Sequence, residues 1–534
     1  MTHISLGKYA YELNDVESRG LIMEISKKSI HMNFERGRAQ QIVTVDDDFN
    51  VPDNKPDIVK KIKETADVIV EKVRPMEERT AIGGKIRYRL LYAGGNGPSS
   101  MEGQIDFEEV IPIEGMTTQD IIKYNCNLED ITVNVINSRK ISVKAVVTIN
   151  ICVEAQSSRE AVTGLTLENL QSKGSRINVM QLITNKKDIF RIRESMNIPS
   201  DRENIGEIVW SELRIQNMDM RACDGEIAIK GELCVFCIYT ADGTDEMNFY
   251  DDVIPFSGKI QAAGCTEEML PDISAAVSEQ SLIARPDANG EMRILDGELI
   301  LDLDIKGYAD EEYEILSDAY SPSYDLQLDK ENIEYQSYLI RNSVKCRMEE
   351  RFRIPEGGIL QIIDSSGRIN LGDIVEDGAG VTVEGSVTVD VIYIKSDDND
   401  KIGYVRYEVP FSEKADIPAA SDDCVYSCRP GALQISTLLT GGGEINIKCV
   451  TSAEITVTER HEASIIYGVK AEKPDYEKIK ALPGIVGYIT REDDTLWDIA
   501  KKYCTTIKNI MDINELTGQE VAPGTKLMII KSRV

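Results

Sequence analysis

The three histidines and one closely spaced pair of cysteines are the first side chains in this sequence to consider for catalysis or for a metal site. His3, His31 and His461 each lack a second histidine, cysteine or carboxylate at the spacing of a metal site. Cys234 and Cys237 form a Cys-x-x-Cys motif, which occurs in redox and zinc sites. They stand in GELCVFCIY, an expected strand, where residues three apart point to opposite faces. We therefore expect a packing role for both cysteines.

Two further stretches could be taken for a phosphate site or a cation site. AGGNGPSS, residues 93–100, is rich in glycine but lacks the Lys-Ser/Thr pair and the helix that follow a phosphate-binding loop. Asp46, Asp47 and Asp48 lack the alternating oxygen ligands of a calcium loop. A hairpin loop and a solvated strand end are the better interpretations. We expect no catalytic residue, metal or cofactor, and we predict that the protein is not an enzyme.

The charge balance limits the partners of the chain. The sequence has 60 Lys and Arg against 91 Asp and Glu, a formal net charge of -31, which repels phosphate backbones and anionic headgroups. We therefore expect no nucleic-acid partner, and no window approaches the roughly 18 apolar residues of a membrane span. The first twenty residues lack the pattern of a secretory signal, and the 11 cysteines are an odd number scattered along the chain. We expect the chain to remain in the reducing cytosol, without membrane insertion.

At 534 residues the chain is too long for one hydrophobic core, and it contains an internal repeat. NVPDNKPDIVKKI, NIPSDRENIGEIV and RIPEGGILQII recur about every 150 residues. A second landmark, the end of an expected strand, recurs at Tyr92, Tyr239 and Tyr393, and a third follows each tyrosine as VIPIEG, VIPFSG and VPFSEK. Because three landmarks keep their order in three copies, the sequence predicts three units of one kind.

The units have the pattern of antiparallel β-sheets. KISVKAVVTINICVEA and GELILDLDI alternate apolar and other residues, the period of a strand with one buried face. Breaks rich in glycine or aspartate (AGGNG, TADG, KSDDND) follow the landmark tyrosines and predict hairpins. The fold class is therefore mainly β, with three tandem β-sandwich-like units. The alternating apolar residues are Ile141, Val143, Ala145, Val147, Ile149, Ile151 and Val153, and Leu299, Leu301, Leu303 and Ile305.

More polar stretches separate the expected units. QSSREAVTGLTLENLQSKGS follows the first unit, SPSYDLQLDKEN follows the second, and YGVKAEKPDYEKIKALPG is predicted to be an exposed tether before the closing module. The predicted boundaries are an N-terminal segment 1–36, units 37–155, 177–315 and 334–465, a linker 466–484, and a closing module 485–531.

The closing module is predicted to run strand, helix, helix, strand. Thr495 is a candidate N-cap with Asp498 three residues on, and Thr506 is a candidate N-cap for the second helix. TKLMII supplies the closing strand. Leu496, Ile499, Ala500 and Tyr503 fall on one helical face, as i, i+3, i+4 and i+7.

This stretch resembles the LysM family. The resemblance lies in DDTLWDIAKKY, the TTI helix start, Asn514 followed by Leu516, and PGTKL before the last strand. It implies a βααβ fold and a shallow groove for N-acetylglucosamine polymers, between the loops Glu492 to Leu496 and Thr517 to Pro523. The candidate residues for binding a partner or a glycan are Asp493, Asp494, Thr495, Leu496, Trp497, Asn514, Leu516, Val521 and Pro523.

Two residues depart from the pattern of that family. Asp493 and Cys504 occupy positions where LysM domains usually have glycine, and a side chain there hinders a positive φ and the close approach of a ligand. Trp497 has two interpretations, because tryptophan is enriched at binding hot spots but an aromatic residue at helical spacing is often part of a core.

Three β units with motifs such as VPDNKPDI and VIPFSG, followed by one LysM module, resemble the SipL family of spore-coat morphogenetic proteins. The resemblance implies a non-enzymatic scaffold of the mother-cell cytoplasm, at the forespore surface and spore coat, whose LysM module docks a SpoIVA-like coat morphogenetic ATPase. Other coat proteins or further copies of the chain are additional expected partners. The alternative is a protein of the cortex or wall that binds peptidoglycan or another N-acetylglucosamine polymer.

Overall fold

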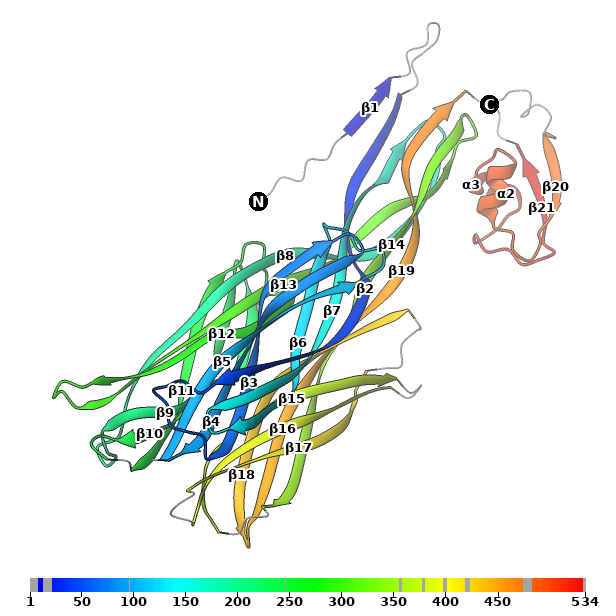
Figure 1. Ribbon diagram of the computed structural model, residues 1–534. Coiled ribbons are helices and arrows are strands. Elements are labelled where there is room, and N and C mark those ends of the chain that lie inside the picture. Colours follow the sequence, from blue (N-terminus) through cyan, green and yellow to red (C-terminus); the bar gives the residue numbers. More distant parts are fainter. Residues whose placement is uncertain are drawn as a thin grey trace.

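The computed structural model describes residues 8–12, 22–95, 97–244, 246–354, 358–376, 380–396, 401–417, 423–473 and 483–531. These residues form an elongated β body, a narrower stalk that rises from it, and a small terminal module beside the stalk (Figure 1). All strand pairs for which a register is defined are antiparallel.

The first unit consists of two facing sheets. One sheet has the order β1-β2-β7-β6 and the other β3-β4-β5. Between them lies a core of buried aliphatic and aromatic side chains, from Val43 to Val153. The strands are β1 (Lys8–Glu12), β2 (Ile22–Asn50), β3 (Lys60–Met76), β4 (Arg79–Gly94), β5 (Gly97–Pro112), β6 (Ile121–Asn137) and β7 (Lys140–Thr166).

The second and third units repeat this arrangement, each with its own core. Their sheets have the orders β12-β13-β8 with β11-β10-β9, and β14-β19-β18 with β15-β16-β17. The strands of the second unit are β8 (Gln171–Asn197), β9 (Ile205–Cys223), β10 (Glu226–Ala241), β11 (Met247–Gln261), β12 (Leu270–Pro286) and β13 (Met292–Tyr320). Those of the third are β14 (Asp325–Arg353), β15 (Ile359–Glu376), β16 (Val381–Lys395), β17 (Ile402–Ala415), β18 (Cys424–Gly441) and β19 (Glu444–Glu472).

The predicted fold class, with three tandem sandwich-like units, is confirmed. The alternating residues of β7, from Ile141 to Val153, are all at most 2% exposed, and so are those of β13 from Leu299 to Ile305. The glycine-rich and aspartate-rich breaks join β4 to β5, β10 to β11 and β16 to β17 as hairpins. Asn96, Pro355 and residues 397–400 of the predicted landmarks lie outside the described residues.

The stalk consists of three ribbons, one from each unit, each built on two long strands, and β1 pairs with the outer end of β2 in the first of them. Each ribbon is the far end of the unit's two longest strands, and the ribbons comprise residues 24–35 with 154–166, 171–182 with 308–320, and 325–338 with 458–472. A register shift marks the junction with the sandwich in every ribbon, between Glu35 and Gly37, Gly307 and Tyr308, and Tyr338 and Ile340. The strands therefore twist away from the sandwiches together at this level.

The three ribbons bury apolar side chains against one another. One shared cluster includes Ile30, Val179, Tyr313 and Ile465, and a second one nearer the tip includes Val162 and Ile466. Each ribbon is too narrow to fold alone, since an isolated two-stranded hairpin is marginally stable in water. The stalk thus joins the three units into one body.

The ribbons occupy the stretches that the sequence predicts as polar connections. Only residues 167–170 and 321–324 lie between strands there, and 466–472, the start of the predicted linker, belong to β19. The sequence pattern does not reveal these strands, because each ribbon exposes most of its polar side chains and buries only one narrow face. The predicted unit boundaries fall inside these long strands, and residues 474–482 of the predicted tether lie outside the described residues.

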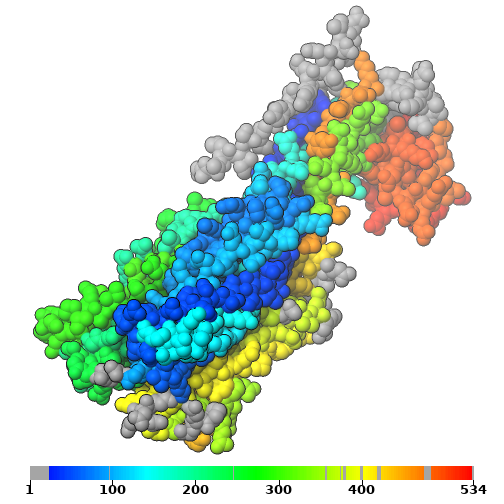
Figure 2. Space-filling model, viewed as in Figure 1, coloured from blue at the N-terminus to red at the C-terminus, as the bar shows by residue number. Residues whose placement is uncertain are grey.

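The terminal module has the predicted βααβ order. It consists of β20 (Ile485–Ile489), α2 (Leu496–Lys502), α3 (Ile507–Ile513) and β21 (Lys526–Ile530). In the space-filling view it forms a separate lobe against the side of the stalk (Figure 2). No helix in the described ranges has both the length and the apolar character needed to cross a membrane.

Candidate functional site

The terminal module is built on two capped helices. The side chain of Thr495 accepts a hydrogen bond from the backbone N–H of Asp498, and that of Thr506 accepts one from Asn509. Both threonines thus satisfy amides that a helix leaves free at its start. The helices bury four side chains beneath the two-stranded sheet, those of Leu496, Ile499, Ala500 and Ile510. The predicted caps and the predicted inner face of the first helix are confirmed.

The two loops of the predicted groove meet at Thr490. Its backbone N–H donates to the carbonyl of Thr525 at 3.0 Å, and its carbonyl accepts from Gly524 at 2.7 Å. This pairing holds the loop before β21 beside the loop before α2. Asp493 and Pro523 are exposed at this place, whereas Leu516 and Val521 are partly buried against the core of the module.

Three of the candidate residues are committed to local structure. The Asp494 carboxylate accepts from the Arg491 amide at 2.8 Å and from the Tyr488 hydroxyl at 2.7 Å, and these hydrogen bonds lower its pKa. Thr495 is the N-cap described above. The Asn514 amide donates to two carbonyls, those of Ile510 and Met528, at 2.8 Å each. Asn514 therefore ties the end of α3 to β21.

Trp497 points at the stalk. Its indole N–H donates to the Asp318 carboxylate at 2.8 Å, and its ring meets that of Tyr320 edge-on, with the centroids 5.0 Å apart. Both partners lie at the end of β13, in the second ribbon of the stalk. The sequence offered two interpretations of Trp497, a core residue or a contact with another protein. The structure adds a third, a contact between the module and the chain's own stalk.

Cys504 occupies a strained backbone position. Its φ of 51° lies in the left-handed region, where glycine is favoured because it has no Cβ. The sequence identified this position as one where the LysM family usually has glycine. Burial raises the pKa of the Cys504 thiol.

The outer face of the β20–β21 sheet is apolar and exposed. Ile485 is 66% exposed, Ile489 60%, Met528 51% and Ile530 39%. Val486 and Tyr488, together with Leu527 and Ile529, point inward to the helices. None of these outer residues is among the candidates predicted from the sequence. The sequence does carry a signal for them: both faces of the two short strands are apolar, while the two helices can cover only one face of the sheet.

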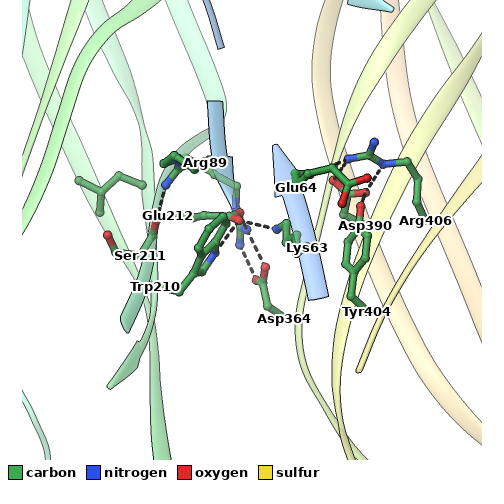
Figure 3. Close-up of polar contacts among 12 residues, drawn as sticks. Lys63, Glu64, Arg89, Trp210, Ser211, Glu212, Asp364, Asp390, Tyr404 and Arg406 are labelled. Carbon is green, nitrogen blue, oxygen red and sulfur yellow. Dashed lines mark hydrogen bonds and ion pairs between the residues drawn. The ribbon is translucent and has the colours of Figure 1, made fainter. Parts of the chain in front are cut away.

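A second polar constellation lies where the three units meet (Figure 3). Lys63 of β3 and Glu212 of β9 form an ion pair with both side chains more than nine-tenths buried. Arg214 bonds to Glu212 at 2.8 Å and to Asp364 of β15 at 2.6 Å, so residues from all three units take part. The Trp210 indole N–H donates to Glu212 at 2.9 Å.

The electrostatics of this cluster follow from its burial. Burial alone would raise the pKa of Glu212, but Lys63, Arg214 and Arg89 outweigh it and hold the pKa well below its usual range. Around it lies an apolar contact that contains side chains of all three units, among them Leu91, Phe236 and Ile392. Lys63 pairs with Glu212 and Arg214 pairs with Asp364, each across a boundary between units, so the cluster joins the units of the body.

A parallel pair lies beside this cluster, on the third unit. Arg406 binds Asp390 at 2.7 Å, and the Tyr404 hydroxyl donates to the same carboxylate at 2.6 Å. The guanidinium of Arg406 also reaches the carbonyl of Glu64 in the first unit, at 3.4 Å (Figure 3). The bond to Glu64 likewise links the third unit to the first.

The other residues singled out from the sequence have structural surroundings. Cys234 and Cys237 are buried in β10, and burial raises the pKa of Cys237 to about 12, so its thiol stays protonated at neutral pH. His461 bonds to Ser337 at 2.8 Å and stacks on Tyr335, while His3 lies outside the described residues. Among the described residues no group of three or more His, Cys, Asp or Glu side chains could hold a metal ion.

Comparison with known families agrees with this architecture. A family model described as SipL, SPOCS domain, matches residues 57–136, 204–282 and 358–438, one segment in each β unit. A model described as LysM domain matches residues 488–529. Searches of the curated proteins and of the solved structures returned no match.

The fold and these matches define a class: proteins with tandem β units and a small C-terminal recognition module, both of them domain types that serve in binding. Within that class the chain is a SipL-type protein, with three SPOCS domains followed by one LysM domain. Its domains are those of sporulation proteins, and its last module is of a type that can bind glycan.

Proposed function

We propose that this protein is a non-enzymatic scaffold of the spore coat. In this proposal it works in the mother-cell cytoplasm at the forespore surface, where its LysM module docks a SpoIVA-like coat morphogenetic ATPase and thereby recruits coat. The three SPOCS units form the body that carries the module and offer further surfaces to other coat proteins or to copies of the chain. Several weak contacts on one chain then act together through raised effective concentration.

The exposed sheet face of the LysM module carries this proposal. Ile485, Ile489, Met528 and Ile530 form an apolar surface on a chain whose formal net charge is -31. A contiguous apolar surface on a small module is typical of a protein contact, since water is released when a partner covers it. A sugar polymer would instead meet the groove loops that contain Asp493 and Pro523.

Deletion of residues 485–534 tests the docking role. The shortened chain should lose the ATPase in a pull-down while its circular dichroism and melting profile stay those of a folded β protein. The SPOCS units keep their own cores in this variant, because none of the three unit cores includes a residue of the module. Retained binding of the ATPase would reject the proposed docking role.

Substitutions on the sheet face test the surface itself. Ile489→Lys and Met528→Lys should each weaken ATPase binding about tenfold or more, because a charge enters an apolar contact. Ile136→Lys is the matched control, since Ile136 is 53% exposed on β6 of the first SPOCS unit and far from the module in sequence. Equal loss with the control variant would show that general surface charge, and not this face, governs binding.

The LysM match also supports a second candidate, a protein of the cortex or cell wall that binds peptidoglycan or another N-acetylglucosamine polymer. Titration of the full chain with chitin or peptidoglycan oligomers separates the two functions. Saturable binding at micromolar concentration that disappears on deletion of residues 485–534 would favour the glycan. Absence of saturable binding would leave the ATPase as the proposed ligand.

A further inference from the structure

The contact between the LysM module and the stalk centres on one carboxylate. Asp318 accepts from the indole of Trp497 at 2.8 Å and from the ammonium of Lys501 at 2.7 Å. Trp497 and Lys501 stand four residues apart, on one face of α2. Asp318 therefore receives two donors from the same helix face, one of them charged, and such charge-assisted hydrogen bonds are stronger than neutral ones.

Tyr320 supplies the apolar half of the same contact. Its side chain is 6% exposed and belongs to the core cluster of the module, although the residue lies at the end of β13 in the second SPOCS unit. Its ring packs edge-on against Trp497, and its hydroxyl donates to the carbonyl of Thr505 at 3.0 Å. The module thus completes its core with a side chain from the stalk.

The other two ribbons lack these groups at the matching positions. Near its tip each ribbon has a second register shift, which can be used to align the three ribbons. The first paired residue beyond this shift is Gly164 on β7 in the first ribbon, Asp318 on β13 in the second and Gly468 on β19 in the third. Two residues further on stand Thr166, Tyr320 and Lys470. Since the three ribbons share one geometry here, the carboxylate and the tyrosine are special to the ribbon that receives the module.

The docked module presents its sheet outward. Figure 1 shows α2 and α3 between the stalk and the β20–β21 sheet, so the exposed apolar face points away from the stalk. The same orientation covers one side of α2. A partner can therefore reach the sheet face while Trp497 stays in contact with Tyr320.

We propose that Asp318 and Tyr320 form a docking surface on the stalk whose occupant is the α2 face of the chain's own LysM module. The surface holds the module in one orientation, with the sheet face free for a partner, and makes Trp497 an internal contact. Residues 473–484 join β19 to β20, so the two surfaces are tethered and meet at an effective concentration on the order of millimolar. This inference does not depend on what the module binds.

Fluorine NMR of the full chain labelled with 5-fluorotryptophan tests the proposal. The sequence has two tryptophans, so two resonances are expected. Trp210, which is 3% exposed where the SPOCS units meet, serves as the internal reference, and Trp497→Phe assigns the other signal. In Asp318→Lys the Trp497 resonance should move or broaden as the docked fraction falls about tenfold relative to the free fraction, while the Trp210 resonance stays in place.

Reversal of both charges provides the rescue. Lys501→Asp should displace the Trp497 resonance as Asp318→Lys does, and the double variant should return it toward its original position, because the ion pair is restored with the opposite sense. Glu314→Lys is the matched control: Glu314 is a 70% exposed acid of the same ribbon that pairs with Arg176 and lies outside the contact. Asp318→Asn covers the case in which a charge reversal impairs folding.

The NMR results on these variants decide whether the docking surface exists. An unchanged Trp497 resonance in Asp318→Lys, or an equal change in Glu314→Lys, would overturn the proposed docking surface. Addition of the ATPase gives an independent reading, in which binding with the Trp497 signal unmoved supports an outward sheet face. ATPase binding that shifts the Trp497 signal to its position in Asp318→Lys would overturn the proposal that the partner binds the outward sheet face while the module stays docked. Failure of the ATPase to bind would contradict the proposed function and leave the docking result standing.

Discussion

Lys63 of the first SPOCS unit and Glu212 of the second form an ion pair in the interior of the protein, with side-chain exposures of 1% and 8%. The pair lies between units, so the SPOCS domains are joined by polar contacts as well as by apolar ones. Arg214 extends the contact to Asp364 of the third unit. One connected set of charges thus involves every SPOCS domain.

Loss of Lys63 should destabilise the body. Lys63→Met keeps a side chain of similar length but leaves the Glu212 carboxylate with fewer compensating charges in a buried place. Because removal of one partner of a buried pair costs roughly 3–5 kcal/mol, and Arg214 still compensates in part, we expect a loss of about 3 kcal/mol. Denaturant unfolding measures it, and Lys27→Met, at an exposed ion pair with Glu160, should change stability by less than about 0.5 kcal/mol.

The Glu212 carboxylate should make this stability depend on pH. Its pKa is lowered in the folded protein, so its contribution is fully present above the ordinary value of 4.5 and is lost as pH falls below that value toward the folded-state pKa. The stability difference between the wild-type protein and Glu212→Gln should therefore shrink between pH 6 and pH 3. Unfolding curves at both pH values measure this stability difference. A difference that grows as the pH falls from 6 to 3 would contradict the lowered pKa of Glu212.

Relief of backbone strain at Cys504 should stabilise the LysM module. Cys504→Gly removes the Cβ from a residue with φ of 51°, and we expect a gain of roughly 1 kcal/mol. Thermal melting followed through the Trp497 signal reports on the module. Cys504→Ala keeps the Cβ while removing the thiol, so it should give no such gain, and equal stabilisation by both variants would mean that strain is not the cause.

The contact at Asp318 should open in acid. Burial alone would raise the pKa of Asp318, but hydrogen bonds from Lys501 and Trp497 outweigh it and lower the pKa below the ordinary value of 3.8. Docking is therefore favoured above that value and is lost as pH falls through the lowered pKa. The Trp497 resonance should move to its undocked position in this range. In Asp318→Asn its position should not change with pH there, and a wild-type-like titration of that variant would assign the effect to another group.

Local patterns in the sequence determined the β units and the LysM module. The alternation from Ile141 to Val153 predicts strands with one buried face, and Thr495 and Thr506 mark helix starts, because side-chain period and capping depend on residues only a few positions apart. The three repeated landmarks also predicted the number of units that the SPOCS matches identify.

Only the tertiary structure decided what joins these parts. The strands of the stalk ribbons are too polar to show a clear alternation of apolar and polar residues in the sequence. The ribbons become stable because three of them bury apolar side chains against one another. Lys63 and Glu212, or Asp318 and Trp497, are more than a hundred residues apart in the chain. Neither pair leaves a local signal in the sequence, because a charged side chain or an indole can equally well face solvent. Only the fold shows which partner lies opposite it.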